Sequence, residues 1–286
     1  MSSYEKGVSY VSPLVKLSLV AGDTVSNNAV IGKKGHGGGF FVYEQSSSPL
    51  APVMLFRLKY VTIFSNKALG TVLGNETSGI FYMQKRLSPR ASFSISNCRI
   101  SNNRGIGITL SGTPDPLGGG ALIDNRNNRI IRIEQNQMRK NNIAIYLDKT
   151  LPTDIVGNNF AVNNKIDIYC NDILEKVRIR KNSFSTKKSS AGIFIQKSSD
   201  PIIIVKNNFS GYADRIKHLA VRVLRVIVGP LGGKYFINAK NNYWGDPKGP
   251  NDPAAFGIDG DYNTSPKGCY VSDWVDYKPP SESINR

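Results

Sequence analysis

Short runs of apolar and β-branched residues recur along the whole chain, and stretches rich in asparagine, glycine and serine separate them. The runs fall at residues 79–82, 91–95, 105–108, 130–133, 144–147, 167–170, 177–179, 192–195 and 202–205. Short β-branched runs with such boundaries are typical of strands and not of helices. The pattern therefore predicts an all-β chain.

A repeated unit underlies these runs. Each unit contains one large apolar residue, which we name the anchor, and neighbouring anchors lie 22 to 38 residues apart. The anchors are Val25, Ile63, Ile100, Met138, Phe160, Phe184, Phe209 and Tyr243. A recurring unit of about this length is typical of a solenoid.

Asparagine occurs at two fixed distances from the anchors. Asn136, Asn158, Asn182, Asn207 and Asn241 lie two residues before their anchors, and Asn28, Asn66, Asn103, Asn141 and Asn163 lie three residues after theirs. Asparagine tolerates the left-handed backbone conformation that a sharp corner between strands requires. Asparagine amides that stack in a column can also hydrogen bond along it. We therefore expect these asparagines at the corners of the solenoid.

The unit length predicts a parallel β-helix. Units of 22 to 25 residues with two or three short strands suit one coil of such a helix, whose coils stack about 4.8 Å apart. We predict about eight coils over residues 14–245, after an N-terminal segment at 1–13 and before a closing tail at 246–286.

The longer units carry extra sequence that is rich in glycine, serine or proline. Loops are predicted at residues 33–38, 44–51, 85–90 and 113–119. An insertion at 212–233 fits either a short helix that begins at Asp214 or a strand at 221–228, and the sequence leaves both open.

Particular phrases of the repeat resemble a known superfamily. Ile95-Ser-Asn-Cys-Arg-Ile-Ser-Asn-Asn103 and Val205-Lys-Asn-Asn-Phe209 resemble the repeats of the right-handed parallel β-helix superfamily, which includes pectate-lyase-like proteins and NosD-like proteins. The stretches 241–250 and 271–277 resemble the segment that closes many of these helices. The resemblance implies an all-β, right-handed parallel β-helix (solenoid) and an extracellular or cell-surface location. It implies no particular activity, because one fold hosts many functions.

The net charge changes the picture of possible partners. A formal charge of +16 favours association with polyanions such as acidic polysaccharides, nucleic acids or anionic membranes. The basic residues are dispersed through the repeats, which favours a charged solenoid exterior over a nucleic-acid-binding arm. Cys98, Cys170 and Cys269 form no C-x-x-C pair, so we expect three separate small hydrophobic residues. The chain has no apolar stretch long enough for a membrane span, and its start lacks the layout of a signal peptide.

Short motifs with catalytic or metal-binding associations lack the residues that would complete them. The glycine-rich stretch around His36 has no nucleophile motif of an α/β-hydrolase and none of the acidic signatures of a polygalacturonase. Asp259 and Asp261 have the opening spacing of a calcium loop, but the required glycine and bidentate acid are missing. Asp148 and Asp167 are the nearest candidates for a carboxylate pair, and we expect them at opposite ends of one face. We therefore predict no catalytic residue, no metal site and no cofactor.

An aromatic column is the main candidate site. Alignment of the second strand of each unit places five rings at one position, with Gly107 as an interruption: Phe41, Phe81, Tyr146, Tyr169 and Phe194. Side chains alternate between the two faces of a strand, so the rings point outward if the flanking aliphatic residues point inward. Exposed rings on a flat sheet suit sugar rings, and exposed apolar patches usually mark binding surfaces. The alternatives are mutual stacking, cover by a loop or by the tail, and an inward orientation.

Two charged columns accompany the rings. Lys181, Lys206 and Lys240 each lie three residues before an anchor, and like charges so close together repel one another unless an anion intervenes. These lysines are candidates for contacts with an acidic ligand, although lysines that extend into water are the alternative. Arg132, Asp154 and Arg178 lie six residues before their anchors and alternate in sign, which indicates a structural column.

The sequence favours a non-catalytic surface protein that contacts glycans or other acidic polymers through the aromatic and lysine columns. One alternative is a polysaccharide lyase or glycoside hydrolase acting on an acidic polysaccharide, which would require carboxylates clustered on adjacent coils. The other is a purely structural envelope or virion component. The expected partner is an acidic polysaccharide or glycan, with neither nucleic acid nor a membrane span.

Overall fold

The fold is known from a computed structural model. It describes residues 15–19, 22–31, 38–44, 54–69, 77–84, 92–112, 131–150, 152–185, 189–199, 202–212, 219–223, 237–252, 263–264, 268–271, 275–278, 280–281 and 283. Within these ranges every regular element is a strand, apart from the single 3-10 turn η3 (Ser210–Tyr212). The expectation of an all-β chain is confirmed.

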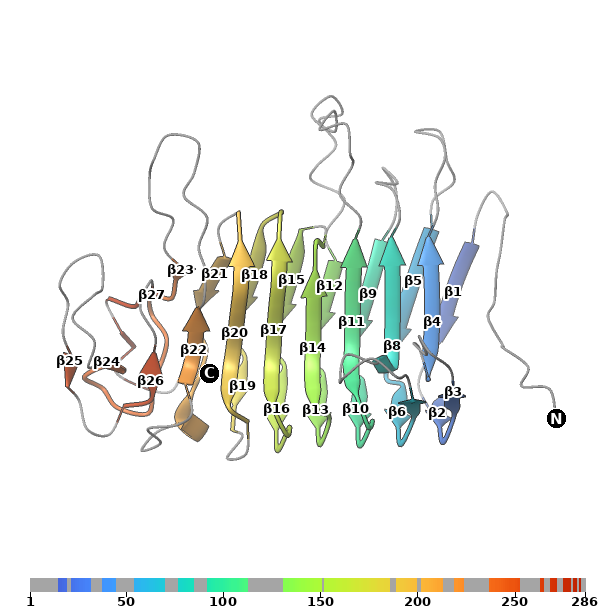
Figure 1. Ribbon diagram of the computed structural model, residues 1–286, viewed down its shortest axis with the longest axis horizontal. Helices are drawn as coiled ribbons and strands as arrows, with labels where there is room; N and C mark the ends of the chain where they lie inside the picture. The colour runs from blue at the N-terminus through green and yellow to red at the C-terminus, as the bar shows by residue number, and fades with distance from the viewer. Residues whose placement is uncertain are drawn as a thin grey trace, which may run out of the picture.

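Three sheets run side by side along the long axis of the molecule (Figure 1). The first sheet has the order β1 (Val15–Leu19), β5 (Met54–Lys59), β9 (Ser92–Ser96), β12 (Ile131–Glu134), β15 (Thr153–Val156), β18 (Val177–Arg180), β21 (Ile202–Val205), β23 (Ile237–Asn238) and β27 (Val275–Asp276). The second sheet has the order β2 (Thr24–Ser26), β6 (Thr62–Phe64), β10 (Arg99–Ser101), β13 (Gln137–Arg139), β16 (Asn159–Ala161) and β19 (Ser183–Phe184).

The third sheet forms the face that is turned toward the viewer in Figure 1. Its order is β4 (Phe40–Glu44), β8 (Thr77–Gln84), β11 (Ile106–Gly112), β14 (Ile143–Asp148), β17 (Ile166–Ile173), β20 (Ala191–Ser198), β22 (Leu219–Val223), β26 (Tyr270–Val271), β24 (Asn251–Asp252) and β25 (Asn263–Thr264). A small extra sheet pairs β3 (Ala29–Ile31) with β7 (Lys67–Leu69). Neighbouring strands come from successive units and pair in parallel, except β24 with β25. The chain is therefore a parallel β-helix, as the repeat predicts.

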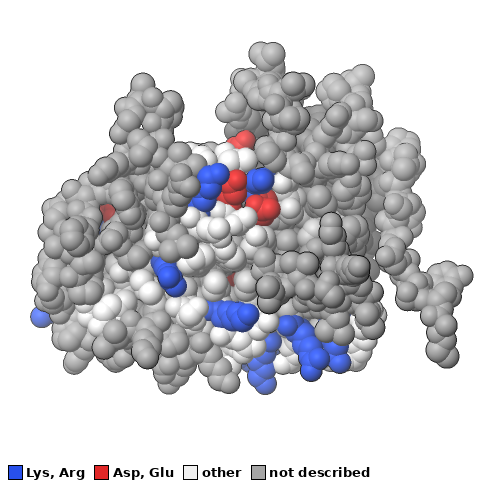
Figure 2. Space-filling model, viewed as in Figure 1, with Lys and Arg blue, Asp and Glu red and all other residues white. Residues whose placement is uncertain are grey.

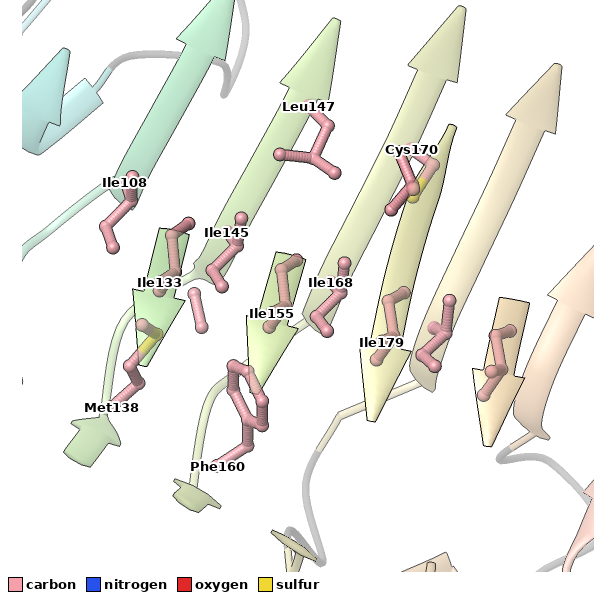
Figure 3. Close-up of a cluster of buried hydrophobic side chains, with 14 of the residues drawn as sticks. Ile108, Ile133, Met138, Ile145, Leu147, Ile155, Phe160, Ile168, Cys170 and Ile179 are labelled. Carbon is pink, nitrogen blue, oxygen red and sulfur yellow. The ribbon is translucent and has the colours of Figure 1, made fainter. Parts of the chain in front are cut away.

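The interior is filled by stacked apolar columns. Ile133, Ile155 and Ile179 of the first sheet face Ile145 and Ile168 of the third sheet across the coil (Figure 3), and all five are buried. Such columns arise because each strand contributes alternate side chains to the inside and parallel pairing brings equivalent positions together.

The anchors form their own column inside the second sheet. Their pairing runs in register from Val25 to Phe184, as predicted. Four rings then stack nearly parallel, with centroid distances of 4.9, 4.6 and 5.0 Å between Phe160, Phe184, Phe209 and Trp244. The last anchor is thus Trp244, and the assignment to Tyr243 is wrong. The sequence has two adjacent asparagines before these residues, and only the packing selects the register that continues the ring stack.

Asparagines form two hydrogen-bonded ladders along the solenoid, and all of them except Asn28 are buried. The first runs through Asn136, Asn158, Asn182, Asn207 and Asn242, and the second through Asn28, Asn66, Asn103, Asn141 and Asn163. In each step a side-chain amide donates to the Oδ1 atom of the next asparagine and, in most steps, to a backbone carbonyl. Asn158, for example, donates to Oδ1 of Asn182 at 3.0 Å and to the carbonyl of Ile133 at 2.9 Å. The ladders satisfy backbone groups that the corners would otherwise bury without partners.

The ladder asparagines are not the residues with left-handed backbone. That conformation belongs to the residue immediately before each of them, for example Gln135, Lys181 and Lys206, with φ angles of 55°, 57° and 57°. The expectation that the recurring asparagines take the left-handed corner conformation is therefore wrong for all of them except Asn241, whose φ angle is 57°. The corner residue varies because it needs only to tolerate its backbone angles, whereas a residue that continues the ladder must supply both a side-chain donor and an acceptor, as asparagine does.

Some predicted features lie outside the described residues. These are the segment 1–13, the larger part of each predicted loop, Asp214, His36, Asp259 and Asp261. β22 covers Leu219–Val223, so a strand occupies the start of the segment predicted at 221–228.

Candidate functional site

The outer face of the third sheet carries a continuous column of paired side chains. Its members, from one coil to the next, are Phe41, Phe81, Thr109, Tyr146, Tyr169, Phe194 and Arg222. The aromatic alignment is confirmed, but the interruption is Thr109 and not Gly107. The pairing of β8 with β11 places Thr109 opposite Phe81, two residues beyond Gly107, and a change of two residues leaves the column on the same face of the strand.

Three rings of this column are accessible at the surface. Tyr146, Tyr169 and Phe194 are half-buried, and the flanking Ile145 and Leu147 are fully buried, so the rings point outward. Phe81 is 7% exposed and offers little surface to a ligand. The side chain of Phe41 lies outside the described residues.

Neighbouring rings of the three contact one another, and a cation, Arg222, lies next to the last ring. Tyr146 and Tyr169 meet edge to face with centroids 5.0 Å apart, and Tyr169 and Phe194 are tilted with centroids 4.9 Å apart. The exposed guanidinium of Arg222 lies 5.4 Å from the Phe194 ring centroid, within the range of a cation–π interaction. We name Tyr146, Tyr169, Phe194 and Arg222 the ring column.

A row of polar side chains lies beside the ring column, two residues further along each strand. Asn171 donates from Nδ2 to Oδ1 of Asp148 at 3.0 Å, and the Tyr169 hydroxyl donates to Oε1 of Gln196. One residue further on, Lys197 pairs with Asp172 at 3.0 Å. Figure 2 shows acidic and basic side chains together over the upper ends of the strands on this face.

Asp148 also acts on both phenols. Burial, followed by the Asp148 carboxylate, raises the pKa of Tyr146 and of Tyr169 above the usual tyrosine value. Both hydroxyls therefore keep their protons at neutral pH and can donate hydrogen bonds. The face thus combines flat apolar rings with hydroxyl, amide and carboxylate groups at their edge, a combination that suits a polyhydroxylated ligand.

Comparison with known proteins agrees with this architecture. A family model described as "Right handed beta helix region" matches residues 18–215, more than half of the chain. The chain belongs to the right-handed β-helix family. Neither the curated proteins nor the solved structures gave a match.

This β-helix protein shows no grouped carboxylates where sequence reasoning looked for them. Asp148 ends β14 at the surface, whereas Asp167 is fully buried and accepts hydrogen bonds from Asn163 and from the Tyr212 hydroxyl, both at 2.8 Å. The expectation that Asp148 and Asp167 share one exposed face is therefore wrong, because Asp167 ends the second asparagine ladder. In the described ranges, no three His, Cys, Asp or Glu side chains gather as a possible metal site.

The predicted lysine column does not exist as a set of three. Lys181 and Lys206 do occupy one exposed corner position on neighbouring coils, between the first and second sheets. The equivalent residue of the next coil is Asn241, because Asn242 takes the ladder position. Lys240 lies one residue earlier, at the end of the first sheet, and pairs with Asp276 at 3.0 Å. The one-residue shift of the last anchor explains the error.

Other expectations about charged and sulfur-containing residues are confirmed. Arg132, Asp154 and Arg178 pair in one column, and Asp154 lies 3.0 Å from Arg178. The three cysteines are free and buried. In the part of the chain that the structure describes, no helix is long and apolar enough to cross a membrane.

Sequence reasoning missed the polar row and Arg222. Asp148, Asn171 and Gln196 follow the aromatic positions by two residues in each strand, which is a period-2 signal on the same face. That spacing could have revealed the row. Arg222 could not be placed, because it belongs to a strand inside the ambiguous insertion.

Proposed function

We propose that this β-helix protein binds an uncharged glycan on the outer face of the third sheet, with the ring column as the contact surface. The observation that carries the proposal is the row of three touching, half-buried rings beside three hydrogen-bonding side chains. Aromatic rings offer a large rigid surface at low cost in conformational entropy, and their polar edges fix the orientation of a ligand.

The charges on this face favour an uncharged ligand over an acidic one. Asp172 is neutralised by Lys197, and the remaining charges among the described residues of this face are Asp148 near one end of the ring column and Arg222 at the other. An acidic polymer that covered the rings would approach the carboxylate of Asp148, which costs free energy in a partly desolvated place. An uncharged glycan instead donates hydroxyl protons to Asp148 and Gln196.

A double variant, Tyr146→Ala with Tyr169→Ala, tests the site. If a sugar ring covers about 50 Å² of one tyrosine, the contact contributes about 1.3 kcal/mol at about 25 cal/mol per Å², or roughly tenfold in Kd for each ring. The measurement is binding to an array of uncharged hexose and N-acetylhexosamine oligomers, followed by titration calorimetry with the best ligand. Product analysis on the same oligomers separates binding from cleavage.

Tyr60→Asn is the matched control. Tyr60 is 51% exposed at a corner away from the ring column and has a φ angle of 59°, which asparagine tolerates. It removes an exposed ring without touching the proposed site, so glycan binding should be retained. Equal affinity in the double variant and in the parent chain would refute the proposal, and so would the absence of binding to every uncharged oligomer.

A further inference from the structure

A second surface of the molecule carries basic side chains and, among its described residues, no acidic ones. It comprises the outer face of the second sheet and the corner that leads from it to the third sheet. Six of its described residues are basic and exposed, and none is acidic: Lys67, Arg99, Arg104, Arg139, Lys140 and Lys165. We name this set the basic edge. Figure 2 shows basic side chains without acidic ones along the lower edge of the molecule, below the glycan-binding face.

The basic edge is continuous from coil to coil. Lys67 and Arg104 are neighbours at the corner, since the Arg104 N–H donates to the Asn66 carbonyl at 3.1 Å. Arg139 and Lys140 belong to the next coil, and Lys165 to the one after that. At about 4.8 Å per coil, the six cations extend over about 14 Å along the axis. No ion pair of these residues occurs within the described ranges, so no carboxylate among the described side chains offsets the repulsion between their charges.

One exposed apolar residue, Val162, lies among these cations and has an unusual backbone conformation. Val162 follows Lys140 in the corner column, is 38% exposed and has a φ angle of 57°. The equivalent position holds Asn27, Ser65 and Asn102 in other coils. A β-branched residue with left-handed backbone is a steric outlier, and retained strain of this kind tends to mark functional positions. The basic edge therefore presents an exposed methyl pair next to Lys140.

We propose that the basic edge binds an acidic polysaccharide that lies along the axis of the solenoid. Such a polymer carries regularly spaced carboxylates or sulfates on a rigid chain, which match cations repeated once or twice per coil. The planar guanidinium groups of Arg99, Arg104 and Arg139 can bind such anions in a bidentate manner. The apolar faces of the sugars provide a contact for Val162.

Other polyanions fit this surface less well. Proteins that bind single-stranded nucleic acid usually provide aromatic side chains on which the bases stack. The outward ring among the described residues of the second sheet is Phe64, and it is half-buried. Binding to an anionic membrane gains from apolar side chains that enter the lipid, and Val162 is small for that role.

The test compares two pairs of charge-removing substitutions in the full chain. Arg139→Gln with Lys140→Gln alters the basic edge, and Arg57→Gln with Lys176→Gln removes the same charge from exposed residues of other faces. The probes are polygalacturonate and chondroitin sulfate, with a single-stranded poly-dT oligonucleotide and phosphatidylserine-containing vesicles as competing partners. We expect the Kd for one of the polysaccharides to rise at least tenfold in the basic-edge variant and less than threefold in the control variant.

Val162→Asn provides an independent readout. Asparagine relieves the backbone strain, so the melting temperature should stay level or rise, while the polysaccharide affinity falls at least threefold. Equal weakening by the two charge-removing variants would overturn the proposal, since net charge alone would then explain binding. Stronger binding to poly-dT or to the vesicles, with the same dependence on Arg139 and Lys140, would also overturn it. The double tyrosine variant should bind acidic polysaccharide normally, so failure of the glycan-binding proposal is distinguishable from failure of this one.

Discussion

The contribution of the asparagine ladders to stability can be measured at Asn182, the middle member of the first ladder. Its Nδ2 atom donates to the carbonyl of Ile155 at 2.9 Å and to Oδ1 of Asn207 at 3.0 Å. Its Oδ1 atom accepts from the backbone N–H and from Nδ2 of Asn158, at 2.8 and 3.0 Å. Asn182→Ala removes all four hydrogen bonds from a buried place.

The size of the effect follows from the groups that lose a partner. The Ile155 carbonyl and the Asn158 N–H lose their hydrogen bonds to the side chain and remain buried. A buried polar group without a partner costs about 1–3 kcal/mol, so the two together cost about 2–6 kcal/mol. That is a large share of the free energy of unfolding, typically about 5–15 kcal/mol. At about 2–4 °C per kcal/mol, we expect the melting temperature to fall by about 4–24 °C.

The assay is urea and thermal unfolding followed by circular dichroism, with Asn159→Ala as the matched control. Asn159 is the asparagine that directly follows the ladder residue Asn158, but its side chain is exposed. Its replacement should change the free energy of unfolding by less than about 0.5 kcal/mol. If Asn182→Ala destabilised the protein no more than Asn159→Ala does, the idea that buried amides hold successive coils together would be refuted.

Three further predictions follow from the core and from the titratable groups. Phe184 is fully buried between two stacked rings. Phe184→Ala should therefore lower the free energy of unfolding, measured by urea denaturation, by about 3–5 kcal/mol. A loss below about 1 kcal/mol would contradict a stabilising role of the ring stack. Burial raises the pKa of the Cys98 thiol, and it raises the pKa of the Cys170 thiol to about 12. Iodoacetamide at about pH 8 should therefore label these two thiols only after denaturation, and mass spectrometry of the labelled protein checks this. Burial and then Asp148 raise the pKa of the Tyr146 hydroxyl above its value in the unfolded chain. The contribution of this group to stability is therefore complete below about pH 10 and is lost as the pH rises through the folded-state pKa. Tyr146→Phe should reduce the loss of stability at alkaline pH, and an unchanged pH profile would count against the shift.

The coil architecture could be predicted from local spacing. The alternation of aliphatic and aromatic residues at Ile145, Tyr146 and Leu147 predicts that the aliphatic side chains point inward, because successive side chains of a strand alternate between its faces. Ile145 and Leu147 are indeed fully buried. The recurrence of an anchor every 22 to 38 residues predicts the stacking, and the structure pairs these anchors in register from Val25 to Phe184. The alternation spans only a few residues and the anchors recur at a regular interval, so both can be recognised in the sequence without knowledge of tertiary contacts.

The candidate sites depended on the register between coils. Strand pairing placed Thr109, and not Gly107, between Phe81 and Tyr146, and a one-residue ambiguity at Asn241 and Asn242 removed Lys240 from the lysine column. The basic edge also required the fold, because its cations are dispersed over residues 67–165 in the sequence.

By itself, then, the sequence determined the fold class, the repeat and the face on which most strand residues lie. These follow from hydrophobic burial and backbone geometry, which act over short separations. Only the tertiary structure decided which residues of successive coils are neighbours, as with Arg222 beside Phe194 or Asp167 at the end of an asparagine ladder. Neighbours in a solenoid are selected by the packing of side chains two or three dozen residues apart, and several registers share almost the same local pattern.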